Sequence, residues 1–495
     1  MYLITEGRGL LVMDKELKIK KFRWLAVVVL LVASFMDLLD TTIVNVALPS
    51  IQEDLDASSA QLVWIVSGYV LSFAVLLITG GRLGDRYGRK TIFNIGVFGF
   101  TLASVACAFA QTADGLVISR LVQGAFGAIM IPQVLSIIQV LFKPKERAAV
   151  FGLVGGISGL AAVAGPLVGG LLVSGDAFGL GWRSIFIINV PVGVLLLIAS
   201  FAFVPNSKSK KPVKLDILGV SLIVTALFLI IFPLIQGREQ GWPIWIWVML
   251  GASPLLIGAF VALQNHEERS SGMPLIPPSL FKNRGFSAGV VTSFLALSSI
   301  GAFFLIFALY LQIGLGFSAL DAGLASLPFS VGAFFGSGIA VPLAPKIGKF
   351  LIVVGAVLQF IGYFLVKQVI VNQGDGLVGT DLIVPMAIAG VGLTLILVPL
   401  NDLSLAQTDV ENAGAASGVL NTFQQVGGAI GVAVISVIFF DVVGMNFSPA
   451  GLRDGFELAI WAPLVSVVLT GVSSFLLPSV SQMLAHNLAA ENLDE

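Results

Sequence analysis

Charged side chains are scarce in this sequence. Asp, Glu, Lys and Arg make up 11% of the 495 residues, whereas hydrophobic residues make up 57%. A soluble globular protein carries about 25% charged residues, so most of these side chains cannot face water. The formal net charge of -1 provides no general basic surface, and we therefore expect no nucleic-acid partner.

Cysteine and histidine are nearly absent. Cys107 is the single cysteine, so no intrachain disulfide can form, and its apolar surroundings in the sequence favour a small core residue. His266 and His486 both lie outside the apolar runs, which excludes a histidine proton relay inside a membrane. The chain also lacks a large soluble domain and any metal or phosphate motif. We therefore expect no cofactor, no metal site and no enzymatic activity.

Long apolar runs dominate what is present. A membrane-spanning helix needs about 20 apolar residues, and the sequence contains fourteen runs of this kind. Their length and the absence of alternation favour helices over barrel strands. The predicted spans are 24–48, 61–81, 91–110, 114–141, 148–173, 184–204, 215–235, 243–263, 286–312, 320–343, 350–370, 380–403, 413–440 and 456–478.

Lys and Arg are distributed unevenly over the loops. With the amino terminus inside the cell, all but five of the 27 basic residues lie in cytoplasmic segments. The exceptions are Arg120, within a span, and the external Arg183, Arg238, Lys367 and Arg453. This bias predicts that both termini are cytoplasmic. The first residues do not resemble a cleaved signal, and either Met1 or Met13 is the start.

The chain repeats itself weakly. The loop GGRLGDRYGRK (80–90) shares its spacing of leucine, basic residues and glycine with VPLAPKIGKF (341–350). Parallel repeats of this kind predict two six-helix bundles, with two further helices inserted between them. We expect an N-terminal tail at 1–23, a first bundle at 24–204, a linker with the inserted helices at 205–285, a second bundle at 286–480 and a C-terminal tail at 481–495.

The loop at 80–90 carries the most specific pattern. Its glycines allow helices and loop to approach closely, and its aspartate can bind the positive end of a helix dipole from the other half. The alternative is ordinary positive-inside anchoring by the basic residues of the loop, which are Arg82, Arg86, Arg89 and Lys90. The residues predicted to form a cytoplasmic gate are Gly81, Gly84, Asp85, Arg86, Gly88 and Arg89.

Ionisable residues inside the spans predict a second site. Asp37 and Asp40 are three positions apart and share a helix face, and a carboxylate in hydrocarbon is expensive enough to indicate function. Burial raises the proton affinity of a carboxyl group in general, so such a group can load and release protons. Arg120 needs a counter-charge, and either aspartate is its expected partner. The alternatives are hydrogen bonding between helices for the aspartates and snorkelling to the outer face for Arg120.

The fifth span carries a face of small residues. These glycines allow close helix packing, and the proline removes a backbone donor and bends the helix. This face is either a simple packing surface or a hinge and seal between the two halves. The residues concerned are Gly155, Gly159, Gly165, Pro166, Gly169 and Gly170.

Aromatic and amide side chains are candidates for a substrate cavity. Aromatic faces attract flat and cationic ligands, although most of the 36 phenylalanines are expected in the core or facing lipid. The amides of the thirteenth span either line a cavity or join helices. The cavity candidates are Trp64, Tyr69, Gln123, Phe303, Phe304, Phe307, Tyr310, Asn421, Gln424 and Gln425.

Four segments together resemble one family. GGRLGDRYGRK resembles the major facilitator signature, and GPLVGG with its upstream glycines resembles the antiporter signature of exporters. LDTTIVNVALP and GWRSIFIINVPVG resemble the first and sixth spans of fourteen-span drug:proton antiporters of the EmrB/QacA type. The resemblance covers nearly the whole chain. It implies that Asp40 and Arg120 couple transport to protons, and that Asp85 and Arg86 form the cytoplasmic gate.

The resemblance implies a function as well. We expect an all-α plasma-membrane protein of the major facilitator fold, in the bacterial inner membrane, that exchanges lipophilic or monocationic drugs for protons by alternating access. Members that take divalent cations carry an acid where this chain has Ser67, and Asp37 has no counterpart in the common pattern. We expect a monomer in the lipid bilayer, with a periplasmic adaptor as a candidate partner. The rival functions are export of a native metabolite, lipid or peptide-like compound, and a membrane receptor or enzyme.

A latch between the halves is also predicted. The loop after the twelfth span has no basic residue, and its acids Asp409 and Glu411 would face the arginines of the loop at 80–90 in the outward-open state.

Overall fold

The computed structural model describes residues 2–142, 144–176, 179–208, 216–237, 240–270, 274–405, 413–444 and 448–479, and every regular element in them is a helix. The first part of the chain forms α1 (Tyr2–Leu55), α2 (Ser59–Tyr87), α3 (Arg89–Ala108), α4 (Ala113–Leu141), α5 (Pro144–Ser174), α6 (Ser184–Ile187) and α7 (Asn189–Phe203). The rest forms α8 (Ile217–Gln236), α9 (Ile244–Ser270), α10 (Arg284–Leu309), α11 (Ala319–Ile347), α12 (Lys349–Gln373), α13 (Ile383–Leu405), α14 (Ala413–Val443), α15 (Pro449–Ala459) and α16 (Trp461–Ser473).

The helices follow the predicted spans closely. Among the described residues, thirteen helical segments are long and apolar enough to cross a membrane, and each coincides with a predicted span. α5, with 31 residues, lies at the position of the remaining prediction. α1 is already helical from Tyr2, so it includes most of the segment predicted as the N-terminal tail. The segment before the first span contains no proline, so the helix can extend through it.

Large apolar side chains cover the outside of the molecule. Ile244, Leu255 and Ile217 of α8 and α9 are 81%, 74% and 73% exposed, and many more follow on other helices. A soluble monomer rarely exposes contiguous apolar surface on this scale, whereas lipid requires it. The outer surface therefore faces a membrane.

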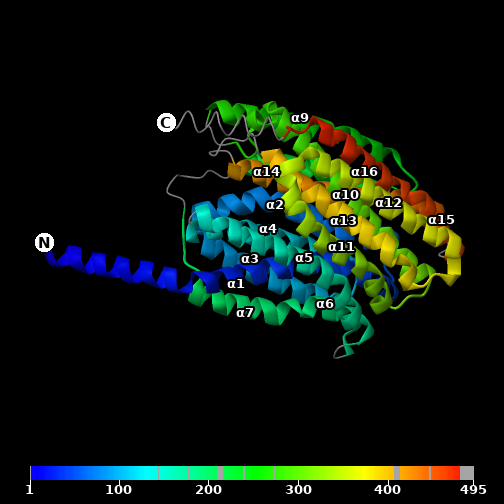
Figure 1. Cartoon of the computed structure of the whole chain (residues 1–495), viewed down its shortest axis with the longest axis horizontal. Coiled ribbons are helices and arrows are strands. Elements are labelled where there is room, and N and C mark those ends of the chain that lie inside the picture. The colour runs from blue at the N-terminus through cyan, green and yellow to red at the C-terminus, as the bar shows by residue number, and fades with distance from the viewer. Residues whose placement is uncertain are drawn as a thin grey trace.

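Two groups of helices pack side by side. α2 and α4 pack closely, as do α1 and α5, and the corresponding contacts in the second half are α11 with α13 and α10 with α14. Between the halves, α5 packs against α11 and α2 packs against α14 (Figure 1). α8 packs against both α2 and α14, and α9 lies outside it, so the inserted pair sits across the junction of the two halves.

The repeat appears in matching local geometry. Gly88 separates α2 from α3 with φ 108°, and Gly348 separates α11 from α12 with φ 57°. Both are in the region that favours glycine. Lys90 then donates to the Phe201 carbonyl at 3.0 Å, and Lys349 donates to the Phe475 carbonyl at 2.9 Å. Each basic residue thus ties the start of one helix to the end of the last helix in its half.

A helix break recurs at the same place in each half. The sixth predicted span is divided into α6 and α7, and the last into α15 and α16. Pro191 and Pro463 occupy the third position of the second helix in each case, and neither can donate to the carbonyl four residues earlier. These carbonyls belong to Ile187 and Ala459, which end the preceding helices. The break places Asn189 at the first position of α7.

Candidate functional site

A buried ion pair lies inside the first half. Asp40 of α1 and Arg120 of α4 are each 1% exposed, and Nη1 of Arg120 lies 2.5 Å from Oδ2 of Asp40. The sequence left open which aspartate pairs with Arg120, and the structure places Asp40 there. A buried charge is tolerated only when it is paired and hydrogen-bonded, so the rest of the polar cluster decides whether this pair is stable.

Two amides complete the surroundings of Asp40. Gln123 of α4 and Asn189 of α7 each donate to Oδ1 of Asp40 at 2.8 Å. Ser104 of α3 lies behind them, 2.9 Å from the Gln123 amide nitrogen and 3.3 Å from that of Asn189. The carboxylate thus receives donors from two further side chains beside the guanidinium. Both of its oxygens are therefore hydrogen-bonded, as a buried carboxylate requires.

The guanidinium is satisfied on its other sides. Nε of Arg120 donates to the Ile65 carbonyl at 3.1 Å, and Nη1 also donates to Oε1 of Gln123 at 2.7 Å. Its central carbon lies 4.2 Å from the ring centroid of Tyr69 and 5.7 Å from that of Phe186. Aromatic faces stabilise a desolvated cation. Arg120 is therefore held within the bundle and does not reach the membrane surface.

Asp37 occupies a different environment one helical turn away. It is 4% exposed, and the Tyr69 hydroxyl donates to its Oδ1 at 2.6 Å. Gly127 of α4 leaves room for this carboxyl group, because a Cβ atom there would lie 2.8 Å from Oδ1 of Asp37. Tyr69 links the two acids, since its hydroxyl contacts Asp37 while its ring covers Arg120.

Asn189 and Ser104 are members of this cluster that the sequence analysis did not single out as site residues. Asn189 lies within the segment GWRSIFIINVPVG that carried part of the family resemblance. A polar residue two positions before a proline within an apolar span was the available signal. Ser104 gave no such signal, because a serine in a membrane helix often bonds its own backbone, and this one also donates to the Phe100 carbonyl.

The predicted gate loop is held by its own side chains and by the linker. Asp85 pairs with Arg89 at 2.8 Å, and Arg89 also donates to the Ser136 carbonyl at 3.5 Å. Arg82 donates to the carbonyl of Pro274, which follows the inserted helices. Gate contacts thus reach α4 and the linker within the described residues.

The remaining gate residues lie at close helix contacts or at the surface. A Cβ atom on Gly84 would collide with the Gln133 side chain, whereas one on Gly81 would lie 3.7 Å from Pro132. Arg86 lies over the Tyr87 ring at 5.3 Å. The acids of the predicted latch, Asp409 and Glu411, lie outside the described residues, so the latch stays a prediction.

The glycines of α5 face two different helices. Cβ atoms added to Gly165 and Gly169 would meet Thr42 and Ile43 of α1, within the same half. A Cβ atom on Gly170 would lie 2.7 Å from the Leu320 Cα of α11, in the other half.

The proline of this face also meets the second half. A Cβ atom added to Gly323 of α11 would collide with the backbone carbonyl oxygen of Pro166. Gly155 and Gly159 lie earlier in α5, and their packing lies outside what the structure describes. The described end of the face therefore contacts both α1 of the same half and α11 of the other half.

The aromatic cavity candidates lie in helix interfaces. Trp64 packs near Phe228 and Phe232 of α8, with ring centroids 6.3 and 6.0 Å away. Phe303 stacks on Tyr363 of α12 at 4.1 Å. The other aromatic candidates pack against neighbouring rings in the same half: Phe304 on Phe329, Phe307 on Phe303 and Tyr310 on Phe456.

The polar cavity candidates divide between the two halves. Tyr69 and Gln123 belong to the buried cluster around the aspartates. Asn421 is exposed and Gln425 is half-buried on α14. Gln424 donates to Asn401 of α13 at 3.0 Å. The structure therefore separates one set of candidates inside the first half from another on the surface of α14.

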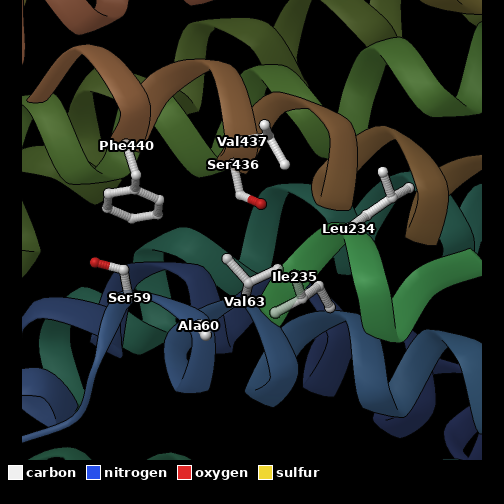
Figure 2. A pocket seen from close by; sticks show the side chains of 8 residues that line it. All are labelled: Ser59, Ala60, Val63, Leu234, Ile235, Ser436, Val437 and Phe440. Atoms are coloured by element: carbon white, nitrogen blue, oxygen red, sulfur yellow. The ribbon is translucent and has the colours of Figure 1, made fainter. Parts of the chain in front are cut away.

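A small apolar pocket lies elsewhere, where α2, α8 and α14 meet. Figure 2 shows side chains from all three helices converging on it. Its lining residues are Ser59, Ala60, Val63, Leu234, Ile235, Ser436, Val437 and Phe440. It contains no ionisable group and stands apart from the aspartate cluster.

Known proteins resemble this chain in sequence. The family model described as Major Facilitator Superfamily matches residues 30–432. The chain is 42% identical over 434 residues to the probable actinorhodin transporter of Streptomyces coelicolor, covering 88% of this chain and 75% of that protein. It is 34% identical over 429 residues to the tetracenomycin C resistance and export protein of Streptomyces glaucescens, covering 86% and 77%.

Solved structures share the fold. A D-xylose-proton symporter superposes with a TM-score of 0.66 at 17% sequence identity, covering 93% of this chain and 99% of that chain. A bacterial homologue of the human lysosomal transporter Spinster, in an inward-facing and unoccupied conformation, superposes with a TM-score of 0.65 at 17% identity, covering 94% and 98%. At this level of identity the likeness concerns the fold alone.

Proposed function

The chain belongs to the major facilitator superfamily, and from this premise we propose that it exports drugs from the cell in exchange for protons. It is a multi-pass plasma-membrane protein whose relatives are transporters. Their names include resistance to or export of tetracenomycin C, puromycin and methylenomycin A. These relatives support antibiotic-like small molecules as its substrates.

The buried Asp40–Arg120 pair is the observation that supports proton coupling. An ionised pair fully removed from water is costly, and in membrane helices such groups mark ion or substrate pathways. Protonation of Asp40 would remove its charge and weaken its bond to Arg120. Because α1 and α4 carry the two partners, the change would alter how these helices pack. For a neutral drug, one proton moved across 100 mV supplies about 2.3 kcal/mol, enough for more than one tenfold step in substrate gradient.

The two halves would alternate access around a central path. α5 and α11 touch where α5 ends and α11 begins, through Gly170 against Leu320 and a bond from the Leu320 amide to Ser174 at 3.1 Å. With the orientation predicted from the basic residues, this end is external. The contact then closes the path to the outside, and α5 and α11 must separate there when drug is released.

A dye-efflux assay tests the proposal. Cells expressing the protein should extrude ethidium, and an uncoupler that collapses the proton gradient should abolish extrusion. Asp40→Asn keeps the shape of the side chain but removes its charge, and efflux should fall to the background of cells without the protein. Asp56→Asn, at the exposed loop between α1 and α2, is the matched control and should behave like the wild type.

Two results would contradict coupling through this residue. One is uphill efflux by Asp40→Asn at equal expression. The other is wild-type efflux that continues at full rate after the gradient is lost.

A second candidate is export of one specific native metabolite. The 42% identity to a probable actinorhodin transporter favours it, because that relative is named for a single compound. A drug panel separates the candidates. Protection against several unrelated drugs supports multidrug efflux, whereas protection against none, with secretion of one compound lost on deletion, supports the specific exporter.

A further inference from the structure

Asp37 is a buried acid without a cation of its own. Within the described residues its hydrogen-bond partner is the Tyr69 hydroxyl, and no salt bridge reaches it. Arg120, the basic residue of the cluster, is engaged by Asp40, Gln123 and the backbone of α2. The two aspartates therefore share one helix face, but Asp40 is paired with a cation and Asp37 is not.

The helices around α1 provide no further charge at this depth. α2, α4, α5, α7, α10 and α11 all pack against α1. α5 and α7 carry no acid or base between Arg147 and Asp176 or within 189–203. α10 carries none after Arg284, and α11 carries none between Asp321 and Lys346, which lie near its two ends. The titratable or charged groups that face Asp37 within the bundle are therefore Asp40 on its own helix, Tyr69 and Arg120.

Desolvation distinguishes the two carboxyl groups. An isolated carboxylate in a medium of low dielectric carries a large unfavourable solvation free energy, whereas the neutral acid carries far less. One phenol hydroxyl does not offset that cost, but a guanidinium with two amides does. We infer that Asp37 holds a proton in this structure while Asp40 stays ionised, which makes Asp37 a second, separate proton-binding site.

This inference rests on the proposed function for its role in transport. With Asp37 protonated, the cluster of Asp37, Asp40 and Arg120 is neutral. When the proton leaves, the Tyr69 hydroxyl continues to donate to the carboxylate, and the cluster gains one net negative charge. A monocationic drug bound nearby would restore neutrality. Exchange of one proton for one monocation is thus balanced in charge, and Asp37 favours monocationic substrates.

Infrared spectroscopy of the protein in lipid nanodiscs tests the location of the proton without any substrate. At neutral pH the wild type should show the carbonyl band of a protonated carboxyl group. Asp37→Asn should lose this band and Asp37→Glu should restore one at a shifted position. A wild type without the band, or an Asp37→Asn variant that keeps it unchanged, overturns the inference.

Two further variants decide the question even if Asp37→Asn does not fold. Tyr69→Phe removes the hydroxyl that contacts Asp37 but keeps the ring over Arg120, so the band should shift. Asn189→Ala removes a donor to Asp40 and does not contact Asp37, so the band should stay in place. The reverse pattern would assign the proton to Asp40 and overturn the inference.

A transport assay tests whether the proton on Asp37 takes part in drug exchange. In proteoliposomes, Asp37→Asn should exchange fewer protons per ethidium than the wild type, and Asp37→Glu should restore the ratio. An unchanged ratio in Asp37→Asn contradicts the role in exchange. If the wild type moves no protons with ethidium, the proposed function fails for this probe, whereas the infrared result still decides where the proton resides.

Discussion

At the scale of single residues, the two aspartates of α1 show how neighbouring side chains influence the chemistry of a carboxyl group. Asp40 and Asp37 are one helical turn apart and both nearly inaccessible to water. One has a guanidinium and two amides, and the other has a tyrosine hydroxyl. Because the environment of a carboxyl group influences which protonation state is stable, we propose different roles for these two identical side chains.

Asn189 gives a prediction at this scale. Asn189→Ala removes a hydrogen bond to the Asp40 carboxylate, and bonds to charged groups contribute about 1.5–3 kcal/mol. We expect ethidium efflux to slow by roughly tenfold, because the geometry of the ion pair loosens. Asn94→Ala is the matched control, since Asn94 bonds Ser200 away from the aspartates. Equal efflux rates for Asn189→Ala and the wild type, at equal expression, would exclude a positioning role.

At the scale of helices, glycines and prolines decide where elements meet and break. Gly88 and Gly348 turn the chain between helices, and Pro191 and Pro463 divide the last span of each half. In α5, Gly165 and Gly169 contact α1 of the same half, whereas Gly170 contacts α11 of the other half. The hydrophobic effect does not drive helices together inside a membrane. Van der Waals contacts at small residues, where the helices approach closely, stabilise their packing instead.

Gly170 gives a prediction for α5. A Cβ atom there would lie 2.7 Å from the Cα of Leu320, and backbone on both sides cannot yield without moving a helix. Overpacking of this kind typically costs about 1–3 kcal/mol. We expect Gly170→Ala to separate α5 from α11 at this end. In a Cys107→Ser background, Leu320→Cys should become more accessible to a membrane-impermeant thiol reagent, and efflux should fall.

The control for Gly170 is a glycine in an open place. Gly338 of α11 has no heavy atom within 4 Å of an added Cβ, so Gly338→Ala should leave accessibility and efflux unchanged. If both alanine variants behave alike, the close contact at Gly170 does not govern closure.

At the scale of the whole molecule, two halves meet along two pairs of helices. α5 packs on α11 and α2 on α14, and the inserted α8 lies over the second junction. α1 also packs against α10 and α11 of the second half, and the last predicted span of each half is divided into two helices. A fold of this kind can change access by movement of one half against the other.

A crosslink tests whether that movement is needed. Ser174 and Leu320 are joined across the halves by a hydrogen bond of 3.1 Å. In a Cys107→Ser background, Ser174→Cys combined with Leu320→Cys should form a disulfide on oxidation and reduce ethidium efflux to background. A reductant should restore efflux, and each single cysteine should be insensitive. Normal efflux by a fully crosslinked protein would show that the two helices need not separate.

The sequence by itself determined the helices and their order. Span length, basic loops and glycine positions act locally, so thirteen predicted spans coincide with described helices, and the turn at Gly88 recurs at Gly348. Candidate ionisable residues were also visible, because an acid or base inside an apolar run is conspicuous without any knowledge of its neighbours. The coupling role of these residues stays a prediction.

Only the tertiary structure decided which side chains meet. Arg120 bonds Asp40 from 80 positions away, and Asn189 reaches the same carboxylate from 149 positions away. Phe303, one of the aromatic residues predicted for a cavity, stacks on Tyr363 of another helix, and the cavity itself stays a prediction. Periodicity indicates which face of a helix is apolar, but the partner of that face depends on how all the helices pack together, and no local pattern records it.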